Sequence, residues 1–188
     1  MIEDCSRVIE RGDFGFFGTV HAAALEIRGL TYHVRGNYAK AINDFTALVE
    51  LDPEYSEGYY HRATALEKLD RLANALQDLD EAIRLMPSGS VRGSALMYNA
   101  RARVLFKMGR AANGLPDASR AIELAPEFAE AYDTRAHIYE AIANDSAEVE
   151  YFHLAVVNYR KALELKPGLR ESLDGLERMG LPLKDGEK

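Results

Sequence analysis

A short phrase that ends in proline recurs four times along the chain. It reads LVELDP at residues 48–53, AIRLMP at 82–87, AIELAP at 121–126 and ALELKP at 162–167. The prolines are 34, 39 and 41 residues apart, so one base period is kept and two insertions, of five and seven residues, are added. A fixed period of this length indicates a repeat architecture, in which units that cannot bury their apolar faces alone stack on one another.

Within each unit the apolar and small residues follow a helical spacing. In the first unit one face of the second helix is outlined by Tyr38, Ala41, Ile42, Phe45, Leu48 and Val49. A run around Leu25, Gly29 and Tyr32 forms the helix before it, and Gly36 can adopt the left-handed conformation that ends that helix. Each proline blocks continuation of the second helix because its ring fixes φ and it lacks an N–H. The sequence therefore predicts a pair of antiparallel helices in every unit.

Charged residues recur in phase with the prolines. Equivalent places on the four first helices hold Arg28, Arg62, Arg101 and Arg135. Matching places on the second helices hold Asp44, Asp78, Asp117 and Asn158. This constant offset predicts a contact that bridges the two helices of each unit, with a structural rather than a catalytic role. For partly exposed pairs we expect a contribution of about 1 kcal/mol or less.

These units resemble tetratricopeptide repeats. Residues 22–169 follow the family's pattern of large, small and aromatic residues, then Ala, an aromatic residue and Pro, in about four units. The Trp that is usual near the start of a unit is replaced by Leu25, Tyr59, Tyr98 and Tyr132. The resemblance implies an all-α fold: a right-handed superhelical solenoid of antiparallel helix pairs, with about four repeats, an N-terminal half-repeat and a C-terminal capping helix.

On this basis residues 1–188 are expected to form a single domain. Its expected parts are a half-repeat and loop at 1–21, repeats at 22–55, 56–94, 95–128 and 129–169, and a capping helix at 170–180. The insertion at 88–94 is expected to be a polar, flexible junction, and the one near 143–150 is expected to lengthen the helices of the fourth unit. Insertions of this kind either set binding specificity or are neutral changes of length.

The third unit departs from the pattern at Gly114 and Pro116, where a continuous second helix is expected. A proline inside a helix typically costs about 3 kcal/mol. We therefore predict that this helix is kinked or begins late, near Leu115.

The two ends of the array differ. Residues 2–11 resemble the second helix of a preceding unit whose first helix is absent, with Cys5, Val8 and Ile9 as its apolar positions. Three phenylalanines in the connection that follows are expected to cover the first helix pair, with anchoring of a partner as the alternative: Phe14, Phe16 and Phe17. At the other end a capping helix with a polar outer face is predicted from its apolar stripe, which comprises Leu169, Leu173, Leu176 and Met179.

Charge and cysteine content argue against several classes of function. The formal net charge is −7, and this disfavours nucleic acid as a partner, because phosphate contacts need a surplus of basic residues. The single cysteine, Cys5, cannot form an internal disulfide. The first residues lack the apolar core of a signal peptide or membrane span, so a soluble chain that does not bind membranes is expected. The cytoplasm is the favoured compartment, with the periplasm as the alternative if the N-terminus is truncated.

The sequence carries no recognisable catalytic motif. Its five histidines show no HExxH or Cys/His metal spacing, and no Gly-x-Ser-x-Gly motif is present. We therefore predict a chain without enzymatic activity, cofactor or metal.

The resemblance implies a concave groove lined by the first helices. Twelve residues occupy the groove-facing places of the family and are called the groove set: Glu26, Leu30 and His33; Tyr60, Thr64 and Glu67; Asn99, Arg103 and Phe106; Asp133, His137 and Glu140. With four acids and one arginine, the set disfavours capture of an acidic C-terminal tail, the family's best-known mode. It favours basic or neutral segments with apolar anchors at Tyr60 and Phe106.

The predicted function is that of a non-catalytic scaffold or adaptor that binds a protein or peptide in this groove. The alternative is a structural element that assembles into homo-oligomers through its incomplete terminal repeat.

Overall fold

The computed structural model describes residues 1–10, 18–87, 91–146 and 148–182. All regular structure in these residues is α-helical, which confirms the predicted fold class. The helices form two compact units, Met1–Ser88 and Gly89–Lys188. Among the described residues, no helix is both long enough and apolar enough to cross a membrane. Phe14, Phe16 and Phe17 lie outside the described residues.

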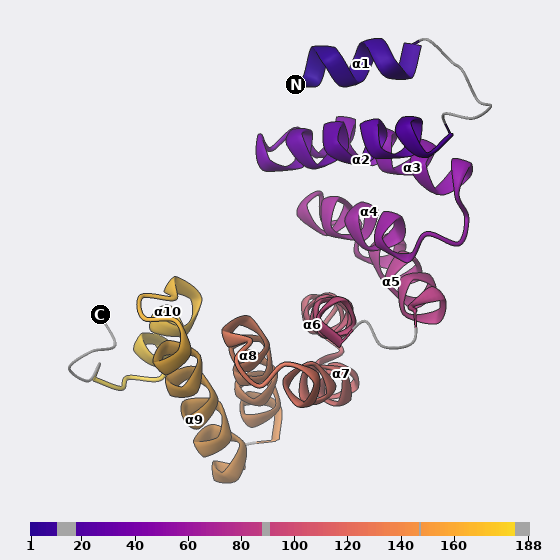
Figure 1. The fold of residues 1–188 in the computed structure, drawn as a ribbon. Coiled ribbons are helices and arrows are strands. Elements are labelled where there is room, and N and C mark those ends of the chain that lie inside the picture. The colour runs from indigo at the N-terminus through magenta and orange to yellow at the C-terminus, as the bar shows by residue number, and fades with distance from the viewer. Residues whose placement is uncertain (11–17, 88–90, 147, 183–188) are drawn as a thin grey trace. The chain divides into compact units, whose positions relative to one another are not determined.

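The first unit contains the half-repeat and two helix pairs. Its helices are α1 Ile2–Glu10, α2 Gly18–Val34, α3 Tyr38–Leu51, α4 Ser56–Lys68 and α5 Leu72–Leu85. Within each pair α2 packs along α3 and α4 along α5, and α4 also packs against α3, so that the pairs stack (Figure 1). The half-repeat joins this stack, because α1 packs on α2 and Ile9 contacts the core around Phe45 and Leu48.

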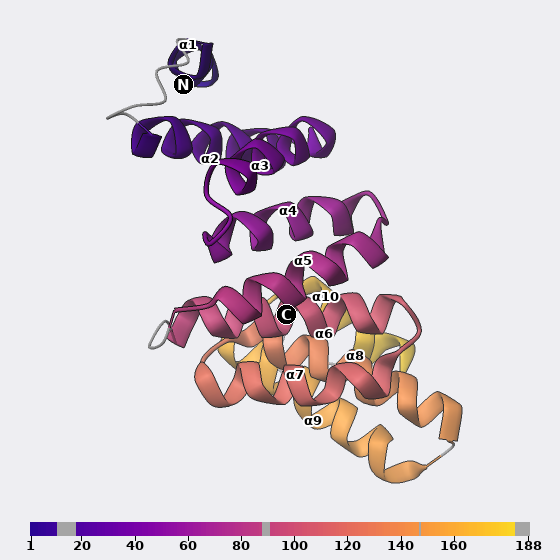
Figure 2. The same cartoon turned by 90° about the vertical axis from the view of Figure 1, so that its right-hand side faces the viewer.

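The second unit contains two further helix pairs and the predicted cap. Its helices are α6 Val91–Lys107, α7 Ala111–Leu124, α8 Ala129–Ser146, α9 Val149–Leu165 and α10 Arg170–Arg178. The pairs are α6 with α7 (Figure 2) and α8 with α9, and α10 packs on both α9 and α8. The predicted apolar stripe of the cap is confirmed, because Leu169 and Leu176 are buried in the core around Tyr159, and Leu173 and Met179 pack against it.

The two insertions behave differently. Helices α8 and α9 have 18 and 17 residues against 13 and 14 in α4 and α5, which confirms that the second insertion lengthens the fourth unit. The first insertion differs from the prediction, because α6 begins at Val91 and its first turn takes in residues 91–94. Residues 88–90 lie outside the described residues. The turn between α2 and α3 is as predicted, with Gly36 at a φ of 76°.

Pro116 does not delay the start of α7. The helix runs from Ala111 to Leu124 with the proline inside it, so the predicted start near Leu115 is wrong, and the predicted kink stays a prediction. Pro116 is exposed, and the single hydrogen bond that its missing N–H removes is the one to the carbonyl of Ala112. Ala112 is exposed as well, so water can satisfy that carbonyl.

The arginines bridge the two helices of each pair, as predicted. Arg28 donates to both carboxylate oxygens of Asp44 at 2.6 and 2.9 Å, and Arg62 does the same to Asp78 at 2.7 and 2.8 Å. Arg101 binds Asp117 at 2.7 and 2.9 Å, and Arg135 donates to Asn158 Oδ1 at 2.9 Å. The three aspartates are buried, so these pairs are less exposed than the sequence predicts. Bidentate geometry fixes the approach of the paired helices.

Three of these arginines also reach the preceding repeat, which the sequence reasoning missed. Arg28 Nη1 donates to Ser6 Oγ of the half-repeat at 2.9 Å, and Arg62 Nη1 lies 3.4 Å from Thr46 Oγ1. In the second unit Arg135 Nη1 is placed in the same way, 3.4 Å from Ser119 Oγ. Each guanidinium after the first also lies over a tyrosine three residues earlier, at 5.5 to 5.9 Å from the centroids of Tyr59, Tyr98 and Tyr132. These tyrosines stand where the family usually has Trp, and they add a cation–π contact.

Candidate peptide-binding surface

The structure places the groove set on four first helices, three residues on each of α2, α4, α6 and α8. The first two helices belong to the first unit and the last two to the second unit. Several members of the set are held by contacts within their own unit, and these contacts decide which side chains can meet a partner.

In the first unit, Glu26 ties α2 to the start of the next repeat. Its Oε1 accepts a hydrogen bond from Tyr55 Oη at 2.7 Å and lies 3.5 Å from His61 Nε2. Burial, together with this hydrogen bond, raises the pKa of Tyr55 far above its ordinary value. Glu26 therefore acts first as a structural link between repeats.

The other members of the first unit differ in exposure. Leu30 is exposed, and the His33 ring packs edge-on against Tyr38 with centroids 5.2 Å apart. Thr64 donates to the carbonyl of His61 at 2.8 Å, and Tyr60 lies beside the His61 ring. Glu67 is only 4% exposed, and Asn99 of the second unit is only 2% exposed. Neither side chain therefore offers much surface to a partner in this structure.

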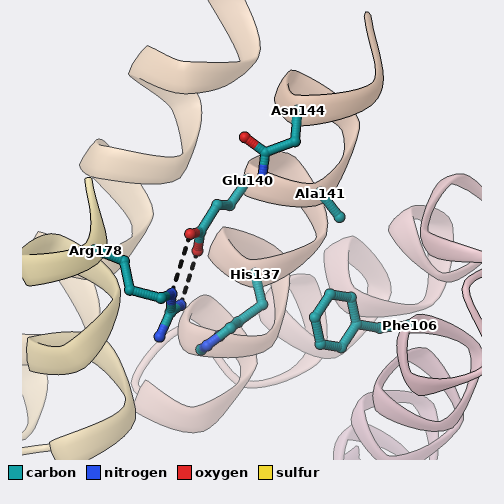
Figure 3. A pocket seen from close by; sticks show the side chains of 6 residues that line it. All are labelled: Phe106, His137, Glu140, Ala141, Asn144 and Arg178. Atoms are coloured by element: carbon teal, nitrogen blue, oxygen red, sulfur yellow. Dashed lines mark hydrogen bonds and ion pairs between the residues drawn. The ribbon is translucent and has the colours of Figure 1, made fainter.

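In the second unit three members of the groove set converge. Phe106 from α6 and His137 and Glu140 from α8 line a pocket of about 290 Å³, together with Ala141, Asn144 and Arg178 (Figure 3). The His137 ring lies between two aromatic rings, 5.7 Å from Phe106 and 5.1 Å from Tyr159. One wall is therefore apolar and aromatic, and the opposite wall is an ion pair.

The ion pair links the cap to α8. Arg178 donates to Glu140 through Nη2 at 2.9 Å and through Nε at 3.2 Å, and Tyr159 Oη donates to the same carboxylate. Burial opposes the charge on Glu140, but the hydrogen bonds from Arg178 and Tyr159 outweigh it, so the pKa of Glu140 is lowered. The carboxylate is ionised and already compensated, which makes this part of the surface less acidic than the sequence suggests.

A second hollow of about 490 Å³ adjoins the first at this ion pair. It shares Glu140, Asn144 and Arg178 with the first and adds Ala143, Phe152 and Met179. Exposed Asn144 lies between the two hollows and can both donate and accept hydrogen bonds. An extended segment that spans both hollows would meet an apolar wall, the amide of Asn144 and the edge of the ion pair.

Sequence reasoning missed Arg178 and Asn144 as lining residues. A signal for Arg178 exists, because it stands eleven residues after Pro167, as His137 stands eleven residues after Pro126. The cap thus supplies a pocket-lining side chain at the position that a further first helix would provide. Asn144 lies in the part of α8 that the second insertion lengthens, where the repeat pattern has no counterpart.

Two partly buried histidines have opposite pKa shifts. Burial lowers the pKa of His61, and the nearby carboxylates Glu26 and Glu57 offset this only in part. Burial also opposes the charge on His137, but the hydrogen bond and charge of Asp133 outweigh it, so the pKa of His137 is raised. Asp133 is itself held by the cap, because Ser172 Oγ donates to its Oδ1 at 2.6 Å.

We predict that an NMR pH titration places the midpoint of His61 below 6.5 and that of His137 above 6.5, their common ordinary value. His61 then costs stability as the pH falls below 6.5, because the unfolded chain binds its proton more readily. His137 contributes stability below 6.5, and this is lost as the pH rises through its raised pKa. Asp133→Asn keeps an oxygen for Ser172 and should lower the pKa of His137 but not that of His61. The reverse order of midpoints would contradict this assignment.

Comparisons with known proteins agree with the stacked helix pairs of this structure. Residues 28–90 match a family model described as a tetratricopeptide repeat. The human mitochondrial import receptor subunit TOM70 is 32% identical over 72 residues, which are 38% of this chain and 12% of TOM70, so the chain spans only a small part of that relative. The crystal structure of MamA matches with a TM-score of 0.68 at 25% identity, and the match covers 88% of this chain and 86% of the MamA chain. The first TPR of Spaghetti (RPAP3), solved with the HSP90 peptide SRMEEVD, matches with a TM-score of 0.59 at 28% identity. This match covers 65% of this chain and 93% of the RPAP3 chain.

Proposed function

We propose that this chain, which is a tetratricopeptide repeat protein, is a non-catalytic scaffold or adaptor that binds a peptide segment of a partner protein on its first helices. The observation that carries the proposal is the convergence of Phe106, His137 and Glu140 with Arg178 around one pocket, with a second hollow beside it. A bound peptide in the solved RPAP3 repeat, which is 28% identical to this chain, supports the same class of function.

The chemistry of this surface favours a basic or neutral segment with an apolar anchor. Phe106 and Ala141 offer an apolar wall for one side chain, and Asn144 can bind the peptide main chain. The arginine that lines the pocket, Arg178, is already paired with Glu140. An acidic C-terminal peptide such as SRMEEVD would therefore gain little from this arginine.

Fluorescence anisotropy with the whole chain tests this proposal with three labelled peptides. The probes are SRMEEVD, a neutral peptide with a central Phe and a Lys-rich peptide with a central Phe. We expect both Phe peptides to bind more tightly than SRMEEVD, and Phe106→Ala to weaken their binding by about tenfold or more, as truncation of an aromatic anchor does. The matched control is Val157→Ala, an exposed site outside both hollows.

Two results would overturn the proposal. Tightest binding of SRMEEVD would refute the charge argument, and equal affinities of the Phe106→Ala and Val157→Ala variants would refute the site. Tyr60→Ala, measured alongside, reports whether the first unit contributes the second predicted anchor.

A second candidate function is self-assembly through the incomplete N-terminal repeat. The observation that favours it is a row of exposed apolar side chains on α2, next to the half-repeat.

A further inference from the structure

Helix α2 carries an exposed apolar stripe on the face opposite its core contacts. The stripe comprises Val20, Ala23, Ile27, Leu30 and Val34. The exposed fraction is 47% for Val20, 44% for Ile27 and 86% for Val34. Its residues alternate in spacing between three and four, so they form one continuous seam along the helix, as in a coiled coil. Scattered exposed apolar residues are normal, but a continuous seam marks a contact surface.

The same face is covered in other repeats. His61 and Thr64 of α4 stand 34 residues after Ile27 and Leu30, and α4 packs on α2 through this side, where His61 meets Glu26 and stacks on Phe45. In the second unit the matching residue His137 of α8 packs against Phe106 of α6. These positions therefore contact the first helix of the preceding repeat. Before α2 the described chain has only α1, which corresponds to a second helix.

We propose that the stripe binds the same stripe of a second copy of this chain, so that two α2 helices pack antiparallel about a twofold axis. This rests on the second candidate function above and names its surface. The seam is self-complementary, because it is apolar along its whole length. Only two residues of α2 carry formal charges, and both are engaged within the first unit: Glu26 by Tyr55, and Arg28 by Asp44 and Ser6. Two copies can therefore meet without charge repulsion.

In α9 and α10, the last helices of the described chain, no apolar seam is exposed that could match α2 in a head-to-tail arrangement. The exposed residues of the cap α10 are charged: Arg170, Glu171, Glu177 and Arg178. Three exposed apolar residues lie on α9, but the spacing of Val149, Phe152 and Val157 is three and five residues, which does not form a seam. A twofold, closed pair is therefore favoured over an open chain of copies.

Sedimentation velocity from micromolar to millimolar concentration tests the proposal with the whole chain. The α2 helix is about 25 Å long, so the interface is smaller than the ~800 Å² per partner of a standard complex, and a weak dimer that dissociates on dilution within this range is expected. Ile27→Glu places two like charges opposite each other and should weaken the dimer by about 100-fold or more, because a twofold axis counts each substitution twice. Val157→Glu, the matched control, should leave the dimer intact.

Cross-linking locates the axis. Ile27 is the middle residue of the stripe, so in an antiparallel pair it faces its own copy. Ile27→Cys in a Cys5→Ser background should form a disulfide-linked dimer under mild oxidation, and Val157→Cys in the same background should not.

The outcomes separate the two claims. A monomer at all concentrations overturns self-assembly itself. A dimer that survives Ile27→Glu, or that is broken by Val157→Glu, overturns the assignment to α2 and leaves self-assembly standing. None of these results bears on peptide binding at Phe106, which is measured independently.

Discussion

Phe45→Ala is expected to lower the free energy of unfolding of the first unit by about 3 to 5 kcal/mol, the usual cost of truncating a buried Phe. The Phe45 ring is fully buried and lies against two helices besides its own, α2 and α4. It lies in its own helix α3, it stacks on His61 of α4 with centroids 5.4 Å apart, and it fills the space next to Gly29 of α2. The loss can be measured by urea unfolding of the whole chain followed by circular dichroism, with hydrogen exchange to assign it to the first unit.

The matched control for this prediction is Phe152→Ala, because Phe152 is exposed on α9 and should change stability by no more than about 0.5 kcal/mol. A loss of equal size in both variants would contradict the role given to Phe45.

The contact between Phe45 and Gly29 predicts that the effect of Gly29→Ala on stability changes sign when the Phe45 ring is removed. A Cβ atom at Gly29 would lie 2.6 Å from Phe45 Cε1, so Gly29→Ala should destabilise the natural chain by overpacking. In the Phe45→Ala background the ring is gone and the same substitution should be stabilising, by up to the ~1 kcal/mol that Ala gains over Gly in a helix. Additive effects of the two substitutions would refute this close approach.

The repeat period correctly predicted the features that recur at equivalent positions of each repeat. Helix pairs, the Arg28 to Asp44 bridge and the apolar stripe of the cap all follow from residues that return at a fixed offset, because equivalent positions meet equivalent neighbours in a stacked array. The left-handed turn at Gly36 followed from local backbone sterics alone.

What the period could not predict depends on contacts with unlike neighbours. Propensity placed the start of α7 near Leu115, but Pro116 is exposed and α7 begins at Ala111, which lies in one apolar cluster with Ala102 of α6. The family offsets place Asn99 in the groove, yet its burial depends on which side chains surround it. Arg178 stands at the same offset from Pro167 as His137 does from Pro126, but the repeat pattern alone does not show that the cap takes the place of a first helix.

The approach of α7 to α6 at Gly114 is the second contact for which we expect a large effect. Equivalent places in the other pairs hold a fully buried alanine: Ala41, Ala75 and Ala155. At Gly114 a Cβ atom would lie 2.8 Å from the carbonyl oxygen of Ala102 and 3.2 Å from Ile138 Cδ1. The carbonyl belongs to the backbone of α6 and cannot rotate away, so any side chain at this place must push the two helices apart.

Gly114→Leu should therefore destabilise the second unit by about 3 kcal/mol, at the upper end of overpacking effects, and lower its melting temperature by about 6 to 12 °C. The exposed neighbour Asn113→Leu, on the same turn of α7, is the matched control and should stay within about 0.5 kcal/mol of the natural chain. Ile138 lies one residue from His137, so a shift of α7 against Ile138 should also disturb the pocket and weaken binding of the neutral Phe peptide. If the Gly114→Leu variant melts within a degree or so of the Asn113→Leu variant, the close packing of α7 on α6 is wrong. The geometry of the pocket would then be wrong as well, because α6 and α8 supply its walls.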